Sequence, residues 1–337
     1  MQKGDIRVVV PCYDSDLTIE KCISSILDSR GIDFELIIVD DGGNNKIGTL
    51  RNQYPFEVIK TKGHEGAGKA RNSGTQGFNG PLVIFIDSDV QINPDTLAAL
   101  IKPIKENLAE ATVGSYSKIH CNNFYQAYKH LYLAYRYGTK PGYLTYTFWS
   151  AVCAVDYKTF TAVKGFKESF MGAGPEDIDL GIELSGTGAR ILSVPEAVGI
   201  HLAELDFTGL IKNDLQKGTE DIYIHWSRKV TLNHNRHVTG ADILSVFIAC
   251  SIPVLLILQH FIGIGLFLVF ILLYFIARIK LIISAFGGEN ILFKIRSFLL
   301  TGLLDVIRGF AVVKGTLLFF MEILSSGKYK PFVKLSA

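Results

Sequence analysis

The chain lacks several features that would mark a well-defined class of protein. None of its five cysteines are paired as C-x-x-C, which argues against a zinc ribbon or a thioredoxin site. Their odd number and scattered positions favour a reducing compartment. The formal net charge is only +2, so the chain has no strong field for nucleic acid, and we expect no such partner. The sequence also has no internal repeat and no low-complexity tract.

The N-terminus lacks the long apolar stretch of a secretory signal peptide. It reads M-Q-K-G-D-I-R-V-V-V-P, so we expect the N-terminal part to stay in the cytosol. A length of 337 residues suggests one large domain with additions, or two domains. Residues 1–240 have the composition of a soluble α/β protein, whereas the remainder holds long apolar runs.

Strands and helices alternate along the first part of the chain. Short β-branched or apolar runs predict strands at 7–10 (stopped by Pro11), 35–39, 56–59 and 82–86, and helical periodicity predicts helices at 16–29, 69–76 and 93–106. This alternation is typical of a mostly parallel sheet with crossover helices. Ligands of such sheets bind at the carboxyl ends of the strands. Asp40-Asp41 and Asp87-Ser88-Asp89 follow two of these strands, so both are candidate site residues.

The last hundred residues predict membrane helices. Two apolar runs with Gln259-His260 between them predict a helical hairpin over about 242–280. Basic residues flank it on both sides, which places both flanks in the cytoplasm by the positive-inside rule. The alternative is a buried hairpin of a soluble protein. We therefore expect a catalytic domain at 1–238 and a multi-pass membrane region at 239–337, with the catalytic domain on the cytoplasmic face.

A third apolar stretch, about 293–325, is interrupted by Asp305, Arg308 and Lys314. Charges are costly at the centre of a bilayer. The sequence therefore favours an amphipathic helix or a re-entrant pair at the membrane interface, and leaves a third crossing open. The tail after it carries Lys328, Lys330 and Lys334, which again favours a cytoplasmic end.

A glycine-rich segment at 62–72, K-G-H-E-G-A-G-K-A-R-N, nearly matches the phosphate-binding P-loop. Position 70 is Ala, however, where that motif needs a hydroxyl for magnesium. Three glycines at 74, 77 and 80 make the following helix short and weak. The acidic strand end at Asp87 also arrives only 18 positions after Lys69, which is barely enough for a crossover. The segment therefore does not indicate an NTPase.

Asp87-Ser88-Asp89 offers a different way to handle phosphate. In an extended chain, side chains two positions apart face the same way, so Asp87 and Asp89 could converge on one cation. Carboxylate oxygens suit Mg²⁺ or Mn²⁺, and a nucleotide diphosphate would complete the coordination. The same pattern alone also occurs in solvated turns.

Four motifs, in order, resemble the inverting glycosyltransferases of family 2. They are V-V-V-P-C-Y-D, E-L-I-I-V-D-D-G-G, the segment G-H-E-G-A-G-K-A-R-N-S-G leading to L-V-I-F-I-D-S-D, and G-P-E-D-I-D-L at 174–180. The resemblance covers about the first 200 residues. It implies the Rossmann-like GT-A fold of nucleotide-diphospho-sugar transferases, a UDP- or GDP-linked sugar as donor, and a divalent cation, Mg²⁺ or Mn²⁺.

The resemblance also implies roles for particular residues. Asp177 would be the general base, beside Glu176 at the start of a helix with Pro175 just inside it; plain N-terminal capping is the alternative. The metal would be held by Asp89 and Asp87, with His201 as a further ligand or a core histidine. The nucleotide sugar would contact Pro11, Tyr13, Asp14, Asp41, Arg71, Asp87, Ser88 and Trp149. For Trp149 an aromatic core position is an equal alternative, for Asp41 a turn, for Pro11 a strand end, and for Arg71 a solvated helix face.

The motif of processive polysaccharide synthases, Q-x-x-R-W, is absent: Gln216 is followed by Lys217, and Trp226 comes much later. Few membrane helices remain to line a polymer channel. We therefore expect transfer of one sugar to a lipid-linked acceptor in cell-envelope polysaccharide biosynthesis, such as a polyprenyl phosphate, a lipid-linked oligosaccharide or a glycolipid. A processive synthase, or a non-catalytic membrane adaptor with a decayed transferase fold, is the alternative. The sequence does not specify the sugar or the oligomeric state.

Overall fold

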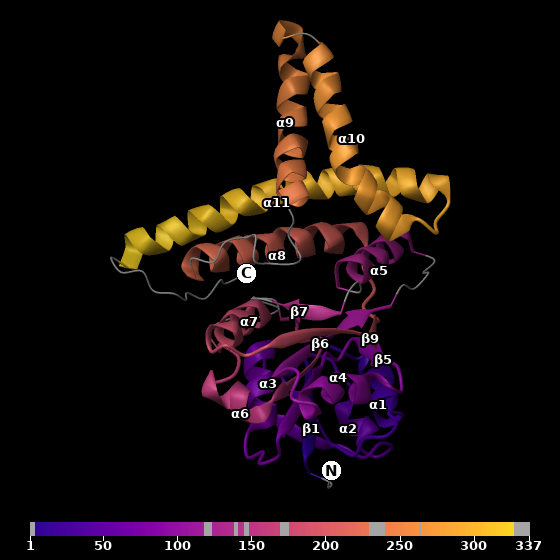
Figure 1. Cartoon of the computed structure of the whole chain (residues 1–337), viewed down its shortest axis with the longest axis vertical. Coiled ribbons are helices and arrows are strands. Elements are labelled where there is room, and N and C mark those ends of the chain that lie inside the picture. The colour runs from indigo at the N-terminus through magenta and orange to yellow at the C-terminus, as the bar shows by residue number, and fades with distance from the viewer. Residues whose placement is uncertain are drawn as a thin grey trace. The chain divides into compact units, whose positions relative to one another are not determined.

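The computed structural model describes residues 4–117, 123–137, 141–144, 148–168, 175–228, 240–262 and 264–326. They form two compact units (Figure 1). The first comprises residues 4–117 and those described from Tyr137 to Glu204. The second comprises residues 123–136, 205–228, 240–262 and 264–326. The functional boundary at 238 stays a prediction.

The first unit is built on one mixed sheet of nine strands. Their order is β3-β2-β1-β4-β8-β6-β9-β5, and β7 pairs with β9. The strands are β1 (Ile6–Cys12), β2 (Glu35–Asp40), β3 (Glu57–Lys60), β4 (Leu82–Ile86), β5 (Val90–Ile92), β6 (Ala111–Tyr116), β7 (Gly142–Leu144), β8 (Val152–Asp156) and β9 (Ile191–His201). Strands β1 to β4 are mutually parallel, as predicted. Antiparallel pairing begins where β8 joins β4, and the sequence did not predict that half.

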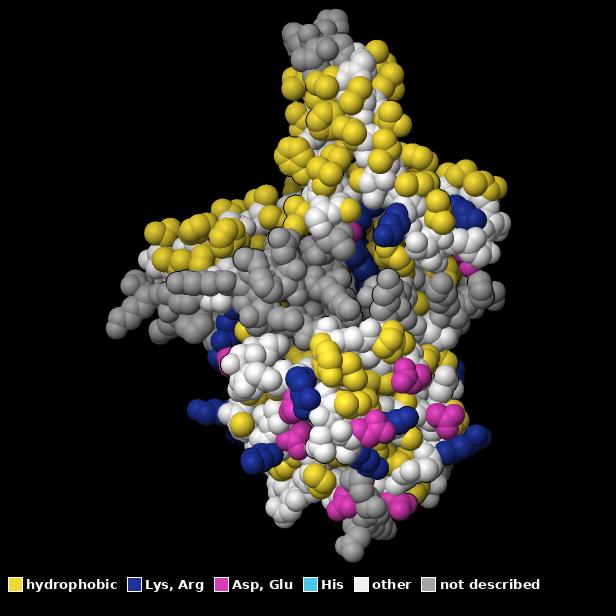
Figure 2. All heavy atoms as spheres, viewed as in Figure 1, with side chains coloured by type: hydrophobic (Ala, Val, Ile, Leu, Met, Phe, Trp, Pro, Cys, Tyr) yellow, Lys and Arg dark blue, Asp and Glu magenta, His cyan; other side chains and the backbone are white. Residues whose placement is uncertain are grey.

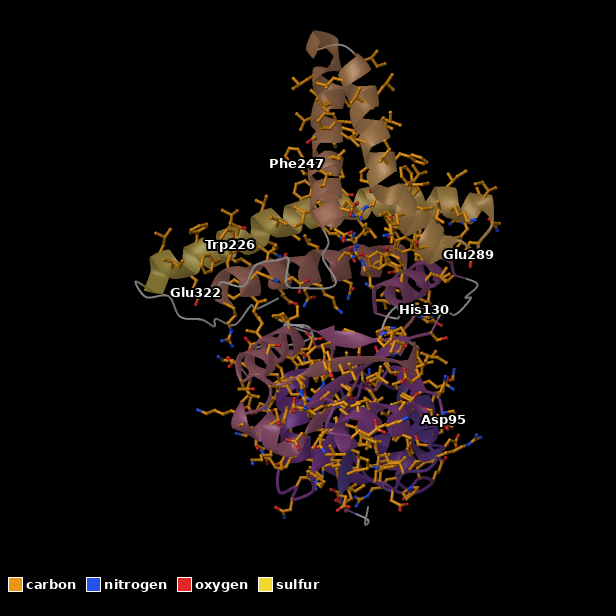
Figure 3. The ribbon with its side chains drawn as sticks, viewed as in Figure 1. Asp95, His130, Trp226, Phe247, Glu289 and Glu322 are labelled. Atoms are coloured by element: carbon orange, nitrogen blue, oxygen red, sulfur yellow. The ribbon has the colours of Figure 1, made fainter. Side chains whose placement is uncertain are left out.

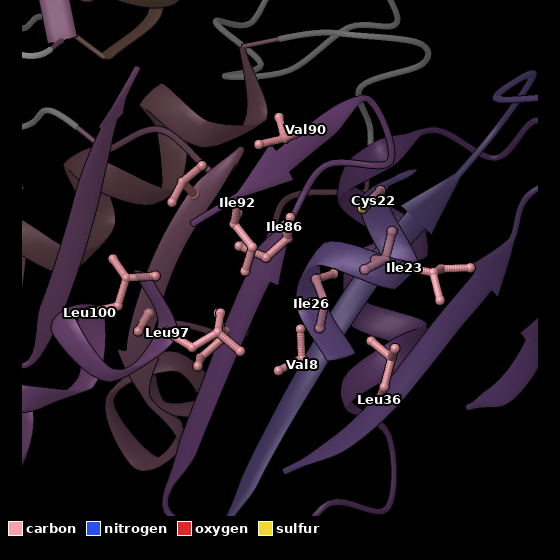
Figure 4. Close-up of a cluster of buried hydrophobic side chains, with 14 of the residues drawn as sticks. Val8, Cys22, Ile23, Ile26, Leu36, Ile86, Val90, Ile92, Leu97 and Leu100 are labelled. Atoms are coloured by element: carbon pink, nitrogen blue, oxygen red, sulfur yellow. The ribbon is translucent and has the colours of Figure 1, made fainter. Parts of the chain in front are cut away.

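Helices cover both faces of this sheet. They are α1 (Ile19–Leu27), α2 (Ile47–Leu50), α3 (Ala67–Thr75), α4 (Thr96–Lys105), α6 (Tyr157–Ala162) and α7 (Glu176–Gly186). Alternate residues of β1 point to opposite faces. Val8 packs with Ile23 of α1 and Leu97 of α4 (Figure 4), whereas Val9 packs with Ala70 of α3 and Leu180 of α7. Buried β-branched strands between two helix layers are what a doubly covered sheet requires.

The sequence predicted that the first strand stops at Pro11. In the structure, β1 runs through Pro11 to Cys12. Pro11 lies opposite Val39 of β2. The pairing of β1 with its other neighbour, β4, already ends at Val9. A proline, which has no N–H to donate, is tolerated in a strand where a side is unpaired.

The described residues of the second unit form five helices: α5 (Phe124–Tyr137), α8 (Phe207–Arg228), α9 (Gly240–Ile262), α10 (Ile264–Phe286) and α11 (Ile291–Ser326). Helices α9 and α10 form the predicted hairpin (Figure 1). Helix α9 continues through Gln259 and His260 to Ile262, so the turn comes later than the sequence predicted.

Within the part of the chain that the structure describes, two helices are by length and composition apolar enough to cross a membrane, over Gly240–Leu258 and Ile264–Phe286. Only 17% and 22% of these two segments are buried, which is unlike the core helices of a soluble protein. Phe247, for example, projects from α9 and is 66% exposed (Figure 3). Hydrophobic side chains cover the visible face of the hairpin (Figure 2).

Helix α11 is one continuous helix of 36 residues, so the structure has no re-entrant pair there. Its polar residues Ser297, Thr301 and Asp305 are fully buried. Its exposed side is mainly apolar instead and includes Leu292, Leu299, Leu303, Phe310, Val313, Leu317, Phe320 and Leu324, together with the exposed Arg296 and Lys314. A helix on the surface of a soluble domain has the opposite pattern. Of the charges that interrupt this apolar run in the sequence, Asp305 and Arg308 belong to an inward-facing polar stripe, whereas Lys314 is exposed.

Candidate active site

The candidate site lies at the carboxyl edge of the parallel strands. Tyr13 and Asp14 follow β1, Asp41 follows β2, and Asp87 follows β4. Strand β1 lies between β2 and β4, so the chain order reverses at this position. Open α/β sheets bind their ligands at such a reversal. The fold therefore brings together acids that are up to 73 positions apart in the sequence.

Asp41 holds the glycine-rich loop in place. Its side chain is 3% exposed and accepts hydrogen bonds from the Thr61 hydroxyl and from the backbone N–H groups of Glu65 (2.9 Å) and Gly66 (3.0 Å). The loop amides that a P-loop would offer to phosphate are thus bound to a carboxylate of the chain itself. The ammonium of Lys69 is likewise bonded to Glu65. The structure agrees with the rejection of the P-loop.

Arg71 joins the two acidic motifs. Its guanidinium donates to Asp87 Oδ1 at 2.6 Å and to Glu176 Oε1 at 3.0 Å. The side chain is 3% exposed and lies over the ring of Phe166. The sequence left a solvated helix face open for Arg71, and its burial excludes that alternative. Because a buried guanidinium fixes both carboxylates, Arg71 links the acids after β4 to those of α7.

Asp87-Ser88-Asp89 forms a tight turn, not the extended segment that the sequence predicted. The N–H of Val90 donates to the Asp87 carbonyl at 3.0 Å. Ser88 points inward, where its hydroxyl is 2.6 Å from that of Ser15. The carboxylates of Asp87 and Asp89 both stay about one-third exposed, with different partners.

Asp89 and His201 lie side by side. Val90 of β5 pairs with His201 at the end of β9, and this brings Asp89 Oδ2 within 3.3 Å of His201 Nε2. A carboxylate and an imidazole with partial exposure are competent ligands for a divalent cation. Over the described ranges, no group of three or more His, Cys, Asp or Glu side chains is arranged to hold a metal. Of the three predicted ligands, Asp89 and His201 lie together, whereas Asp87 is paired with Arg71. Asp89 and His201 are thus the two groups whose chemistry fits a cation that a diphosphate would also coordinate.

Glu176 and Asp177 open helix α7, and Pro175 is the residue just before its first turn, not inside it as predicted. Glu176 is 5% exposed, and burial raises its pKa to about 7, although Arg71 opposes the shift. Asp177 is half-buried and accepts from the N–H of Ile178 at 2.7 Å. Gly174, the first residue of this motif, lies outside the described part of the chain.

The other predicted residues occupy different environments. Tyr13 is 47% exposed and its ring lies 4.6 Å from that of His64. Asp14 adopts a left-handed conformation, with φ of 49°, and accepts from the N–H of Asn44. Trp149 is 6% exposed within the core cluster, which is the alternative that the sequence left open for it.

Sequence reasoning missed three residues of this region. Thr61 bonds to Asp41, His64 packs on Tyr13, and Phe166 lies beneath Arg71. None belongs to a quoted motif position with an assigned role. Gly43 is also required at its position: at a φ of 73° its Cβ would lie 2.6 Å from the N atom of Asp14.

A three-layer α/β unit with acids at the strand reversal belongs to the class of Rossmann-like nucleotide-binding folds. A model of the family described as glycosyl transferase family 2 matches residues 7–164. The chain therefore carries a family 2 glycosyltransferase domain, and its fold is of the GT-A type. The candidate site residues Asp14, Asp41, Arg71, Asp87 and Asp89 lie within the matched segment. Glu176, Asp177 and His201 follow it.

Known proteins agree with this assignment. The chain is 30% identical to glycosyltransferase GlyA of Streptococcus pneumoniae over 115 residues, which cover 33% of this chain and 16% of that protein. It is 28% identical to the dolichol-phosphate mannosyltransferase of Pyrococcus furiosus over 115 residues, or 33% of this chain and 32% of that one. The chain thus matches less than two-fifths of the length of each of these relatives.

A solved structure extends the likeness in fold. The mannosyltransferase PcManGT from Pyrobaculum calidifontis, in complex with GDP-Man and Mn²⁺, superimposes with a TM-score of 0.58 and 14% identity. The superposition covers 93% of this chain and 87% of that one, so it includes residues of the second unit. At this identity the likeness concerns the fold alone.

Proposed function

We propose that the chain is an inverting glycosyltransferase that moves one sugar from a nucleotide-diphosphate sugar to a lipid-linked acceptor. The observation that carries this proposal is the Arg71 bridge between Asp87 and Glu176. It fixes an acid of the donor side to the helix that bears the candidate base, Asp177. Supporting it, PcManGT is in complex with GDP-Man, and one relative is named a dolichol-phosphate mannosyltransferase.

Each group has a task in this reaction. Asp177 accepts the proton of the acceptor hydroxyl, or orients an acceptor phosphate, for in-line attack on the sugar carbon. Glu176 and Asp87, fixed by Arg71, hold the helix start and the strand end at a constant separation. The loop held by Asp41 forms one side of the nucleotide site, and Tyr13 presents an exposed ring there.

A divalent cation, Mg²⁺ or Mn²⁺, would be held by Asp89, Asp87 and His201. When bound, it would neutralise the charge that develops on the departing diphosphate. The neighbour PcManGT, in complex with Mn²⁺, supports such a requirement.

The second unit supports the proposal of a lipid-linked acceptor. Its exposed apolar hairpin and the apolar face of α11 suit a membrane, with the catalytic unit on the cytoplasmic side. A lipid acceptor confined to the same surface has a high effective concentration at the site. An acceptor of this kind would place the activity in cell-envelope polysaccharide synthesis.

Two experiments test the proposal. The first is a screen of UDP- and GDP-linked sugars for protection of the full chain against heat unfolding in Mn²⁺, because binding to the folded state raises apparent stability. No protection by any nucleotide sugar would argue against it. The second is Asp177→Asn, which should abolish transfer and leave donor binding intact. Near-normal turnover in this variant would remove Asp177 from its role as base.

A further inference from the structure

Three loops meet at the reversal of the sheet, and the loop between β1 and α1 is the middle one. Strand β1 pairs with β2 on one side and with β4 on the other. The N–H of Asp14 in this middle loop donates to the carbonyl of Gly42 at 3.3 Å. The N–H of Asp16 donates to the carbonyl of Asn44 at 3.1 Å. The loop that presents Tyr13 is therefore joined by its backbone to the loop after β2.

Two serine hydroxyls join the same loop to the acidic turn Asp87-Ser88-Asp89, which follows β4. The Oγ atoms of Ser15 and Ser88 lie 2.6 Å apart. Ser15 also donates to the carbonyl oxygen of Tyr13, at 3.0 Å. A hydroxyl has one proton, so Ser88 donates to Ser15 when Ser15 donates to Tyr13. The two side chains thus form a short chain of hydrogen bonds from the acidic turn to the backbone of the Tyr13 loop.

Both hydroxyls are buried: Ser15 is 7% exposed and Ser88 is 9% exposed. The thiol of Cys12 also interacts with the Ser15 hydroxyl. Burial raises the pKa of this thiol to about 12, so it stays neutral and is only a weak acceptor. The thiol of Cys22 in α1 donates to the Asp87 carbonyl at 3.4 Å, which is likewise a weak bond. Of the two contacts with the acidic turn, the bond between the hydroxyls is therefore the stronger.

The backbone of the acidic turn is fixed from the opposite side of the sheet. The N–H of Asp87 donates to the carbonyl of Ala151 at 3.1 Å, just before β8. The N–H of Leu202 donates to the carbonyl of Asp89 at 2.7 Å, just after β9. These bonds hold Asp89 beside His201 but do not reach the loop after β1. The serine pair adds that connection, from the side of the cation to the side of the nucleotide.

We propose that Ser15 and Ser88 are positioning residues that hold the cation side and the nucleotide side of the site in one fixed arrangement. Ser88 then acts through the turn that carries Asp87 and Asp89, and not by contact with the nucleotide sugar. A buried hydroxyl that loses its partner is costly, so each serine keeps the other in one orientation. The inference deepens the proposed function and rests on it, because it requires a nucleotide diphosphate and a divalent cation in this site.

The test measures the affinity of the full chain, in a neutral detergent, for UDP and for GDP by isothermal titration. Each titration is done with Mn²⁺ and without it, and we call the ratio of the two affinities the cation enhancement. Ser15→Ala and Ser88→Ala should each lower the cation enhancement by about tenfold, a usual size for the coupling between two sites. The affinity without Mn²⁺ should fall by less, because Asp41 keeps its bonds to the glycine-rich loop.

The double variant Ser15→Ala/Ser88→Ala shows whether the two serines act as a pair. Both hydroxyls belong to one connection, so the cation enhancement of the double variant should equal that of either single variant. Ser88→Thr keeps a hydroxyl and should retain most of the enhancement. Thr112→Val is the matched control, because this fully buried hydroxyl donates to the carbonyl of Leu100 in α4, at 2.8 Å, and not to a residue of the site. It should lower the melting temperature and leave the enhancement unchanged.

Unchanged enhancement in Ser15→Ala and Ser88→Ala, with nucleotide binding by the wild type, would refute the pair and leave the proposed function standing. An equal loss in Thr112→Val would also refute it, because the effect would then reflect a general loosening of the fold. Fully additive losses in the double variant would mean that the hydroxyls act separately. Wild-type binding that Mn²⁺ does not strengthen would overturn this inference alone. Absence of UDP and GDP binding under both conditions would overturn the proposed function as well.

Discussion

At the scale of single residues, Arg71 carries the strongest expectation. Lysine, which has a single ammonium, cannot bridge Asp87 and Glu176 as the planar guanidinium does. Arg71→Lys should therefore lower kcat/KM by about 100-fold, the cost of a misplaced catalytic group. Arg71→Met leaves the buried Glu176 and the partly exposed Asp87 without their shared counter-ion and should destabilise the fold by about 3–5 kcal/mol. Steady-state kinetics and heat unfolding of both variants check this. Arg136→Lys, in the second unit, controls for loss of a buried arginine remote in sequence from the site.

Glu176 should make stability depend on pH. Its pKa is raised from 4.5 to about 7 in the folded state, because burial disfavours the charged form. The folded chain therefore binds this proton more tightly than the unfolded chain. The resulting stability is fully present below pH 4.5 and is lost as pH rises through 7. At about 1.4 kcal/mol per pKa unit, the loss is at most about 3.5 kcal/mol.

The measurement is heat unfolding of the wild type and of Glu176→Gln between pH 4.5 and pH 8.5. Glutamine has no proton to lose, so the variant should show a shallower fall in melting temperature across this range. Identical slopes in the two proteins would mean that Glu176 titrates near its ordinary pKa.

At the scale of elements, the contact between α8 and α11 depends on a glycine. A Cβ on Gly315 would lie 2.5 Å from the carbonyl oxygen of Thr219, a backbone atom that cannot move aside easily. Gly302, on the same helix, has room for a Cβ, with Tyr274 at 3.6 Å. Alanine in place of glycine inside a helix gains about 0.5–1 kcal/mol. Gly302→Ala should therefore be neutral or stabilising.

Gly315→Ala should instead destabilise the fold, because α11 must move away from α8 or bend. Heat unfolding of the two variants in the same detergent compares them directly. The paired design cancels the change in helix propensity, which is the same at both positions. Equal melting temperatures would show that the two helices adjust to a methyl group without cost.

The elements also show what the sequence could predict. Buried β-branched runs and acidic strand ends predicted β1, β2 and β4 and their shared edge, because local patterns determine both. The antiparallel half of the sheet depends on long-range pairing, such as β8 with β4, that leaves no local signal. Asp89 and His201 were expected to meet only through the family resemblance. The hydrogen bonds of Asp41 to Thr61 and the loop could not be predicted, because turn geometry decides which amides face a carboxylate.

At the scale of the whole molecule, the hairpin makes the topology testable. Helices α9 and α10 have 23 residues each, about 35 Å at 1.5 Å per residue, which exceeds a hydrocarbon core of about 30 Å. If both cross the bilayer, Ile264 at the start of α10 lies on the side opposite to the catalytic unit. With the same topology, Gly288, just after α10, would face the cytoplasm, as Asp95 of the catalytic unit would.

Single substitutions Asp95→Cys, Ile264→Cys and Gly288→Cys, treated with a membrane-impermeant maleimide, report these positions. The unsubstituted chain gives the background, to which the buried Cys12, Cys22 and Cys153 should contribute little and the half-buried Cys250 more. In inside-out vesicles we expect labelling at 95 and 288 only, and in intact cells at 264 only. Labelling of 264 together with 95 would mean that the hairpin does not cross, and its exposed apolar surface would then need another covering. Labelling of 264 from neither side would indicate a hairpin that enters the bilayer without reaching the far surface.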